Sequence, residues 1–103
     1  MPEVMAKRCT LFWMPNLNYK IWAQGKHFYV GDWLYFVYNR YQHNILEVNK
    51  TDYERCNSDH PIRNWTRGAG RDVVLLNQTK HYYLIDGRGG CRSGMKLVVK
   101  VEN

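Results

Sequence analysis

The stretch His81–Val101, HYYLIDGRGGCRSGMKLVVKV, contains the clearest strand patterns in this chain. Its last part, Met95–Val101, alternates in the manner of a half-buried strand, and this parity directs Met95 inward. The run Lys80–Ile85 is rich in strand-forming residues. Between the two runs, Gly87–Gly90 must be a loop, because glycine loses the most entropy in regular structure. The stretch therefore predicts two strands joined by a glycine-rich loop.

Four more short runs of strand-forming residues precede this stretch, and turn residues separate them. Two of the runs flank Gly31-Asp32, which by itself suggests a tight turn between neighbouring strands. Several strands at short intervals, without repeats or linkers, predict one all-β domain over residues 1–103, either a sandwich of two sheets or a Greek-key barrel. The four runs are His27–Val30, Trp33–Tyr38, Ile45–Val48 and Asp72–Leu76.

Two short segments favour helix over strand. The sequence Thr51–Glu54 (TDYE) fits a capping box, which predicts a short helix from Thr51 to about Cys56. The segment Asn16–Ala23 (NLNYKIWA) can form another turn or two of helix. We expect its inward-facing side chains to be Leu17, Ile21 and Trp22.

Composition and charge exclude several classes of protein. The chain has 103 residues, 45% of them hydrophobic, which excludes a disordered chain. No apolar run approaches the roughly 20 residues that span a bilayer, so we expect no direct membrane insertion. The net charge of +6 favours polyanionic partners. Nucleic acid is not expected among them, because the cations form no tract and no nucleic-acid-binding motif is present.

Two features favour a secreted protein. Three asparagines begin glycosylation triplets, which are surface sites in secreted proteins. The second feature is the cysteines. A disulfide between two of them is typical of secreted proteins; three pairings are then open, and one thiol stays unpaired. In the alternative, all three are free thiols of a cytosolic protein. The first ten residues contain no apolar leader, so we expect any export signal to have been removed. The asparagines are Asn49, Asn64 and Asn77, and the cysteines are Cys9, Cys56 and Cys91.

Several short motifs follow one another in order from about Trp13 to Val101. They are Tyr19…Trp22-Ala23, Phe28-x-Val30-Gly31-Asp32-x-Leu34-x-Phe36, His43-Asn44, Tyr53-x-x-Cys56, His81-Tyr82-Tyr83 and Cys91-x-x-Gly94-Met95-Lys96-Leu97. This succession resembles the phytocyanins, the plant blue-copper cupredoxins, and most closely their early nodulin-like branch. The resemblance implies a cupredoxin-like Greek-key sandwich with one or two short helices and a Cys56–Cys91 disulfide. Residues 1–12 depart from the usual start of the family, so the role of Cys9 stays open.

A blue-copper centre needs two imidazoles, one thiolate and a weak axial ligand. The resemblance places the first imidazole at His43 and the axial ligand at Met95. It places the thiolate and the second imidazole at positions 85 and 90, where this sequence has Ile85 and Gly90. One imidazole and one thioether hold Cu(II) poorly, so we expect no copper and no other cofactor. His43 and Met95 are then vestigial ligand positions.

Without the metal, that end of the sandwich presents the loops that contain His43 and Gly87–Gly90, which we call the loop platform. Arg88, Arg92 and Tyr41 lie near it in the sequence, and such side chains bind carboxylates and stack on sugar rings. We therefore expect a noncatalytic module that binds an acidic cell-wall polysaccharide, an arabinogalactan or a cell-surface protein. In the alternative interpretation, these arginines are ordinary solvent-exposed residues that bind no ligand. The alternative function is a copper-binding one-electron transfer protein of the phytocyanin type.

The resemblance also implies a location. Early nodulin-like proteins are made with a signal peptide and a C-terminal lipid anchor signal, and they reside at the plant plasma membrane. This chain shows neither segment, so we expect it to be the extracellular domain of a longer, lipid-anchored precursor. No His-plus-nucleophile pair or carboxylate dyad lies at catalytic spacing, and an enzyme is not expected.

Overall fold

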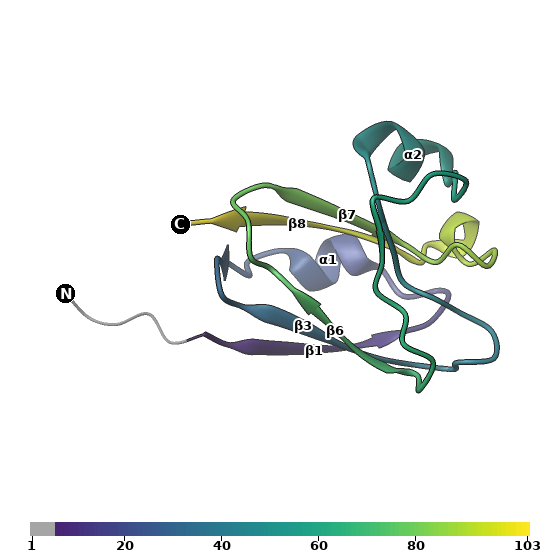
Figure 1. Ribbon diagram of the computed structural model, residues 1–103, viewed down its shortest axis with the longest axis horizontal. Coiled ribbons are helices and arrows are strands. Elements are labelled where there is room, and N and C mark those ends of the chain that lie inside the picture. The colour runs from purple at the N-terminus through teal and green to yellow at the C-terminus, as the bar shows by residue number, and fades with distance from the viewer. Residues whose placement is uncertain (1–5) are drawn as a thin grey trace.

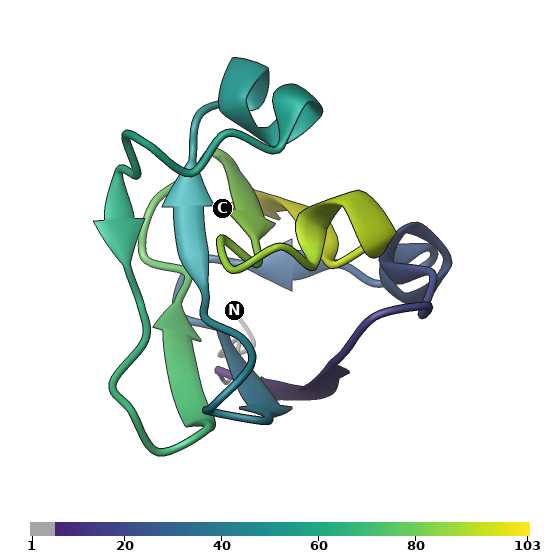
Figure 2. The same ribbon diagram turned by 90° about the vertical axis from the view of Figure 1, so that its right-hand side faces the viewer.

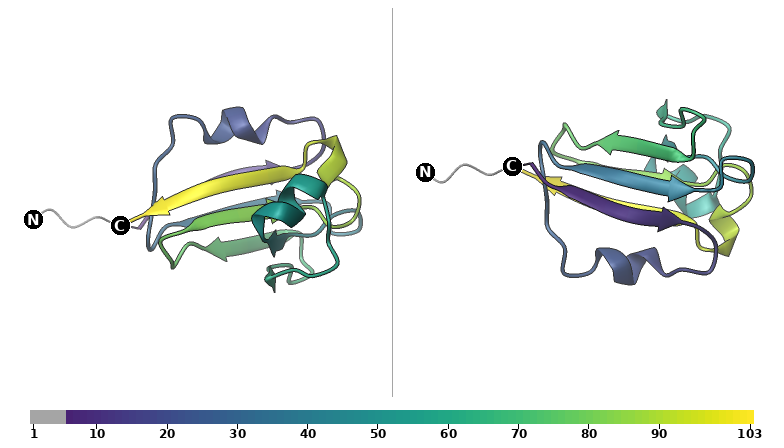
Figure 3. Two further views of the ribbon diagram at one scale, coloured as in Figure 1. Left: turned by 90° about the horizontal axis from the view of Figure 1, so that it is seen from above. Right: turned by 90° about the horizontal axis from the view of Figure 1, so that it is seen from below.

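A computed structural model describes residues 6–103 of the chain. Two sheets stack as layers, which Figure 3 shows from the two sides. The first sheet has the order β1-β3-β6, and the second has the order β2-β8-β7-β4-β5. The strands are β1 (Arg8–Trp13), β2 (Phe28–Tyr29), β3 (Trp33–Tyr38), β4 (Leu46–Val48), β5 (Arg63–Asn64), β6 (Arg71–Leu75), β7 (His81–Ile85) and β8 (Lys96–Glu102). The predicted two-sheet sandwich is confirmed.

Both sheets are mixed. The pairs β1–β3 and β2–β8 are parallel, whereas β3–β6, β4–β5, β4–β7 and β7–β8 are antiparallel. Parallel neighbours need long crossover connections, and the chain makes them by passing from one layer to the other. In Figure 1 these crossovers leave several loops at one end of the sandwich, opposite to the C-terminus.

The Gly31-Asp32 turn joins the two layers instead of two paired strands. It closes tightly, with the Asp32 amide donating to the Tyr29 carbonyl at 2.9 Å. However, β2 pairs with β8 in one sheet and β3 pairs with β1 and β6 in the other. The tight turn expected from the sequence is therefore confirmed, but it does not form a hairpin, because its two strands belong to different sheets. The buried Asp32 carboxylate holds the crossover by accepting from the amides of Tyr29 (2.9 Å) and Lys7 (3.0 Å).

Helix α2 (Lys50–Arg55) confirms the predicted helix, but its cap is a different residue. The Asn49 side chain accepts from the Asp52 amide at 2.8 Å, which makes Asn49 the N-cap instead of Thr51. Asparagine is among the best N-cap residues, so it satisfies a first-turn amide well. The helix ends at Cys56, which adopts the left-handed conformation with φ 52°.

Helix α1 (Tyr19–Ala23) buries a different face from the one expected. Asn18 caps it by accepting from the Ile21 amide at 3.1 Å, so the helical turn starts at Tyr19. Tyr19 is buried and Trp22 half-buried, because residues three apart share a face. The expected inward positions of Leu17 and Ile21 are wrong, since these side chains are 44% and 63% exposed.

The main core lies between the sheets and confirms the parity of the last strand. Leu97, Val99 and Val101 of β8 are buried, and so is Met95 just before it. From the opposite sheet, Leu34 and Phe36 of β3 pack into the same cluster. Burial of such side chains is the main favourable contribution to folding. The strand predictions therefore succeeded where one face of a strand is apolar.

The start of the chain joins the sandwich despite its unusual sequence. Arg8–Trp13 pairs with the whole length of β3, and Cys9 lies opposite Leu34. Burial raises the pKa of the Cys9 thiol, and Lys7 partly opposes that rise. Residues 1–5 of the atypical start lie outside the described residues. Among residues 6–103, no helix has the length and apolar character needed to cross a membrane.

Candidate functional site

His43 lies in the loop between β3 and β4, and this loop belongs to the end of the sandwich that faces the viewer in Figure 2. The His43 amide donates to the Asn39 carbonyl at 3.1 Å, which closes the turn after β3. Its imidazole Nδ1 lies 2.8 Å from Oδ2 of Asp86. The Asp86 side chain is fully buried, and that of His43 is 13% exposed. The predicted vestigial imidazole therefore contacts a carboxylate.

The Asp86 carboxylate is saturated with hydrogen bonds. Its Oδ1 accepts from the amides of Asn44 (3.0 Å) and Arg88 (3.1 Å), and its Oδ2 accepts from the Gly90 amide (2.9 Å). With His43, this gives the carboxylate four partners in a buried site. Burying a carboxylate is costly unless such partners compensate, and hydrogen bonds to a charged group are the strong ones. Asp86 therefore ties together the β3–β4 loop and the loop after β7.

Gly90 and Met95 complete this cluster. The Met95 amide donates to the Gly90 carbonyl, and the Asp86 amide donates to the Met95 carbonyl, both at 3.0 Å. A Cβ atom at position 90 would clash with the Asp86 carboxylate and with the Met95 sulfur. The space for a second imidazole is thus filled by the carboxylate and the thioether.

Ile85 lies on the face of β7 that points away from the main core. Its side chain packs in a second cluster with Leu46, Val48 and Cys91. The side chain facing His43 comes from Asp86, so the structure does not bring Ile85 into the cluster where the family resemblance places a ligand. Strand parity signals this: Tyr82 and Leu84 face the main core, and position 86 follows them at the period of two.

The disulfide implied by the resemblance is confirmed. Cys56 and Cys91 are joined with an S–S distance of 2.04 Å. The bond links the end of α2 to η1 (Cys91–Ser93), a short 3-10 helix in the glycine-rich loop. It therefore braces the loop that holds Gly90.

The donors at this end do not fit a blue-copper centre. Such a centre requires two imidazoles and a thiolate. Nδ1 of His43 faces Asp86, and the sulfurs of Cys56 and Cys91 are bonded to each other. Cys9 lies opposite Leu34 at the start of β3, whereas His43 follows the end of that strand. Across residues 6–103, no group of three His, Cys, Asp or Glu side chains is arranged to hold a metal.

The three contact residues predicted from the sequence are all exposed. Arg88 and Arg92 flank Gly90 along the chain. Tyr41 is 73% exposed, and its hydroxyl accepts from the Arg40 guanidinium at 2.6 Å. The Arg40 guanidinium carbon also lies 4.8 Å from the Tyr41 ring centroid. The cation that the structure places at Tyr41 is therefore Arg40, which no sequence pattern had indicated.

The three predicted glycosylation asparagines are exposed as well. Their side-chain oxygens accept hydrogen bonds from the protein: Asn49 from the Asp52 amide, Asn64 from the Thr66 amide, and Asn77 from the Tyr82 hydroxyl. Surface position is what glycosylation requires. The glycans themselves remain a prediction.

Comparison of the fold first defines a class. The structure is similar to cucumber basic protein, a blue copper protein, with a TM-score of 0.73 and 35% identity over 87% of this chain and 90% of that one. It is also similar to cucumber stellacyanin, with a TM-score of 0.78 and 26% identity over 94% of this chain and 96% of that one. The fold is thus that of the cupredoxin-like blue copper proteins.

Sequence comparison then gives the family. The family description "Plastocyanin-like domain" matches residues 13–95. Early nodulin-like protein 17 of Arabidopsis thaliana is 76% identical over 99% of this chain, and early nodulin-like protein 19 is 69% identical over 98%. The chain belongs to the phytocyanin family, in its early nodulin-like branch. It spans 62% of the length of early nodulin-like protein 17.

Proposed function

We propose that this chain is a noncatalytic phytocyanin-like module of the plant cell surface that binds an acidic cell-wall glycan and holds no copper. The observation that carries the proposal is the Asp86 carboxylate, which occupies the centre of the former metal end and is satisfied by His43 and three backbone amides. Because every partner of this carboxylate is supplied by the protein, the cluster needs no metal ion to satisfy it. Its chemical role is to hold loops in place.

The distribution of charge supports a polyanionic ligand. Four of the nine acidic side chains are buried, so they contribute little negative charge to the surface. Within residues 6–103, the cationic Lys and Arg side chains at salt-bridge distance from a carboxylate are Lys7, Lys80 and Lys100. The other lysines and arginines form no ion pair within these residues, so the surface is more cationic than the net charge of +6 suggests. The buried acids are Asp32, Glu47, Asp72 and Asp86.

The loop platform supplies the proposed contacts. Arg88 and Arg92 lie on the loop braced by the disulfide, and Arg40 stacks on Tyr41 in the β3–β4 loop. Guanidinium groups form bidentate pairs with carboxylates, and loops on a rigid scaffold are common binding sites. An acidic surface of a cell-surface protein would present the same carboxylates. We favour the glycan because its carboxylates repeat along an extended chain, and the basic residues of this protein are likewise spread out.

The location is part of the proposal. The three exposed asparagine acceptors and the disulfide fit an oxidising, extracellular compartment. Relatives in the same branch are longer than this chain, which leaves room in the whole protein for an export signal and a lipid anchor. We propose that the chain is displayed outside the plasma membrane in this way.

Binding to oligogalacturonides tests the proposal. We expect the purified chain to bind a de-esterified oligomer and to release it as salt increases, because screening weakens contacts between exposed charges. The methyl-esterified oligomer of equal length should bind at least tenfold more weakly. If neither the de-esterified oligomer nor an acidic arabinogalactan binds, the glycan proposal is wrong.

A further inference from the structure

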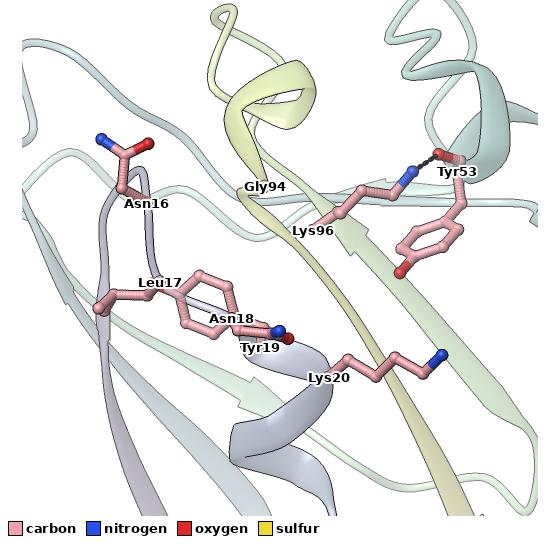
Figure 4. A pocket seen from close by; sticks show the side chains of 8 residues that line it. All are labelled: Asn16, Leu17, Asn18, Tyr19, Lys20, Tyr53, Gly94 and Lys96. Atoms are coloured by element: carbon pink, nitrogen blue, oxygen red, sulfur yellow. Dashed lines mark hydrogen bonds between the residues drawn. The ribbon is translucent and has the colours of Figure 1, made fainter.

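A hollow of about 420 Å³ lies beside the start of β8, between α1 and α2. Figure 4 shows its lining side chains, which come from segments far apart in the sequence. Its volume falls within the range of roughly 300–1,000 Å³ that is typical of small-molecule sites. The polar and apolar side chains used below are Asn16, Leu17, Asn18, Lys20, Tyr53 and Lys96, and we call this site the Lys20–Lys96 hollow.

The hollow is adjacent to the former metal end. Met95 points into the core beside Asp86, whereas its neighbours Gly94 and Lys96 line the hollow. This follows from the alternation of side chains at the start of β8. The start of β8, around Met95 and Lys96, therefore lies between the hollow and the loop platform.

Polar groups without partners line the hollow. Within residues 6–103, the side-chain carboxamide of Asn16, the Lys20 ammonium and the Tyr53 hydroxyl make no hydrogen bond to another protein group. The Asn18 oxygen caps the Ile21 amide, which leaves the Asn18 NH₂ group to donate elsewhere. Such groups can donate to hydroxyl and carboxylate oxygens of a ligand.

Lys96 is a positioned cation. Its Nζ donates to the Tyr53 carbonyl at 2.7 Å and lies 4.1 Å from the Tyr53 ring centroid. One of its three N–H donors is used in this way, so the other two remain. Partial burial lowers the pKa of Lys96, and Glu54 partly opposes that change. An anion next to Lys96 would favour its charged form and oppose this lowering of the pKa, which contributes to binding.

Two cations and no carboxylate line the hollow, which selects for an anion. The amides and the phenol add donors for hydroxyl groups, and Leu17 offers an apolar edge for a sugar ring. We propose that the Lys20–Lys96 hollow binds one uronate residue, with its carboxylate between the two ammonium groups and its hydroxyls on Asn16, Asn18 and Tyr53. This inference rests on the proposed glycan-binding function and assigns that function a subsite apart from Arg88 and Arg92.

Two matched double variants test the site. Lys20→Gln/Lys96→Gln removes the two cations of the hollow, and Lys50→Gln/Lys100→Gln removes two exposed lysines elsewhere with the same change of net charge. Binding of digalacturonate is measured by calorimetry, and neutral digalactose serves as the uncharged probe. We expect the first variant to lose at least tenfold in affinity for digalacturonate and the second less than threefold. Neither variant should change the weaker binding of digalactose.

Lys96 also contacts Tyr53, so its loss could disturb the fold. The single variant Lys20→Gln avoids this, because the Lys20 side chain is exposed and makes no hydrogen bond or ion pair within the described residues. It should weaken digalacturonate binding about fivefold. In wild-type amide spectra, digalacturonate should shift Lys20, Tyr53 and Gly94 more than Asn44 and Gly90.

The outcomes separate the two proposals. If oligogalacturonides bind, but Arg88→Ala/Arg92→Ala abolishes binding of digalacturonate while Lys20→Gln/Lys96→Gln leaves it unchanged, the hollow is not the subsite and the glycan function stands. If wild-type chain binds no carboxylated glycan of any length, the glycan function fails and the hollow loses its ligand with it.

Discussion

Nδ1 of His43 and Oδ2 of Asp86 lie 2.8 Å apart at the loop end of the sandwich. In a blue-copper centre, a metal ion joins the segments that supply its ligands. Here a buried carboxylate joins them, through its contacts to His43 and to the amides of Asn44, Arg88 and Gly90. The scaffold thus keeps its loops in place by hydrogen bonds.

Replacing Asp86 should destabilise the fold. Asp86→Ala leaves three backbone amides and an imidazole without their acceptor in a buried site, and we expect a loss of about 3 kcal/mol. Urea unfolding followed by tryptophan fluorescence measures this loss. Asp59→Ala is the control, because Asp59 is exposed and its carboxylate makes no hydrogen bond or ion pair within the described residues. Equal stability of the two variants would contradict the role of Asp86.

A side chain at position 90 should be tolerated only if its neighbours change. Gly90→Ala places a Cβ against the Asp86 carboxylate and the Met95 sulfur, and we expect a cost of about 2 kcal/mol. Asp86→Ala removes one of the two clashes, so Gly90→Ala should cost less in that background. A double-mutant cycle of unfolding free energies measures this coupling. Strictly additive effects would show that the two positions do not share space.

Copper should not generate a blue centre. The two cysteines at this end of the sandwich, Cys56 and Cys91, are joined in the disulfide, so no thiolate is available there to give the intense colour of a copper–thiolate bond. We expect titration with Cu(II) to give at most weak binding, which His43→Ala would reduce. An intensely coloured complex at one copper per chain would refute both the proposed loss of the centre and the donor arrangement described above.

Tyr38 should make stability fall in alkaline solution. Burial, followed by the hydrogen bond from its hydroxyl to Asp72, raises the pKa of the Tyr38 phenol. An unfolded phenol loses its proton near pH 10, whereas folded Tyr38 keeps it. The stabilisation is therefore complete below about pH 10 and is lost as pH rises through the raised pKa.

Urea midpoints at about pH 9 and 11 measure this dependence. Tyr38→Phe should be less stable at both pH values, because it loses the bond to Asp72, but its stability should fall less steeply. Tyr41→Phe, which removes an exposed hydroxyl, should retain the steep fall of the wild type. Parallel curves for all three proteins would rule out Tyr38 as the source.

Local patterns were sufficient where one physical preference dominates. The alternation of Met95–Val101 placed Met95 and three strand residues inward because one strand face packs on the core. The capping pattern located α2 but chose Thr51, because the pattern does not show that the oxygen of Asn49, two residues earlier, reaches the first-turn amide. Gly31-Asp32 likewise signalled a turn without showing that the strands beside it enter different sheets.

Strand patterns in the sequence predicted the β-rich sandwich, and the family resemblance implied the Cys56–Cys91 disulfide and showed that positions 85 and 90 lack the two expected ligands. Only the folded structure shows that the Asp86 carboxylate contacts His43 where those ligands are missing. It also shows that Arg40 stacks on Tyr41. Lys20, Tyr53 and Lys96 are brought to one hollow in the same way. The physical reason is that strand order and loop packing bring together residues distant in the chain. The same packing buries acidic side chains, so the charge that the protein presents differs from the charge that it contains.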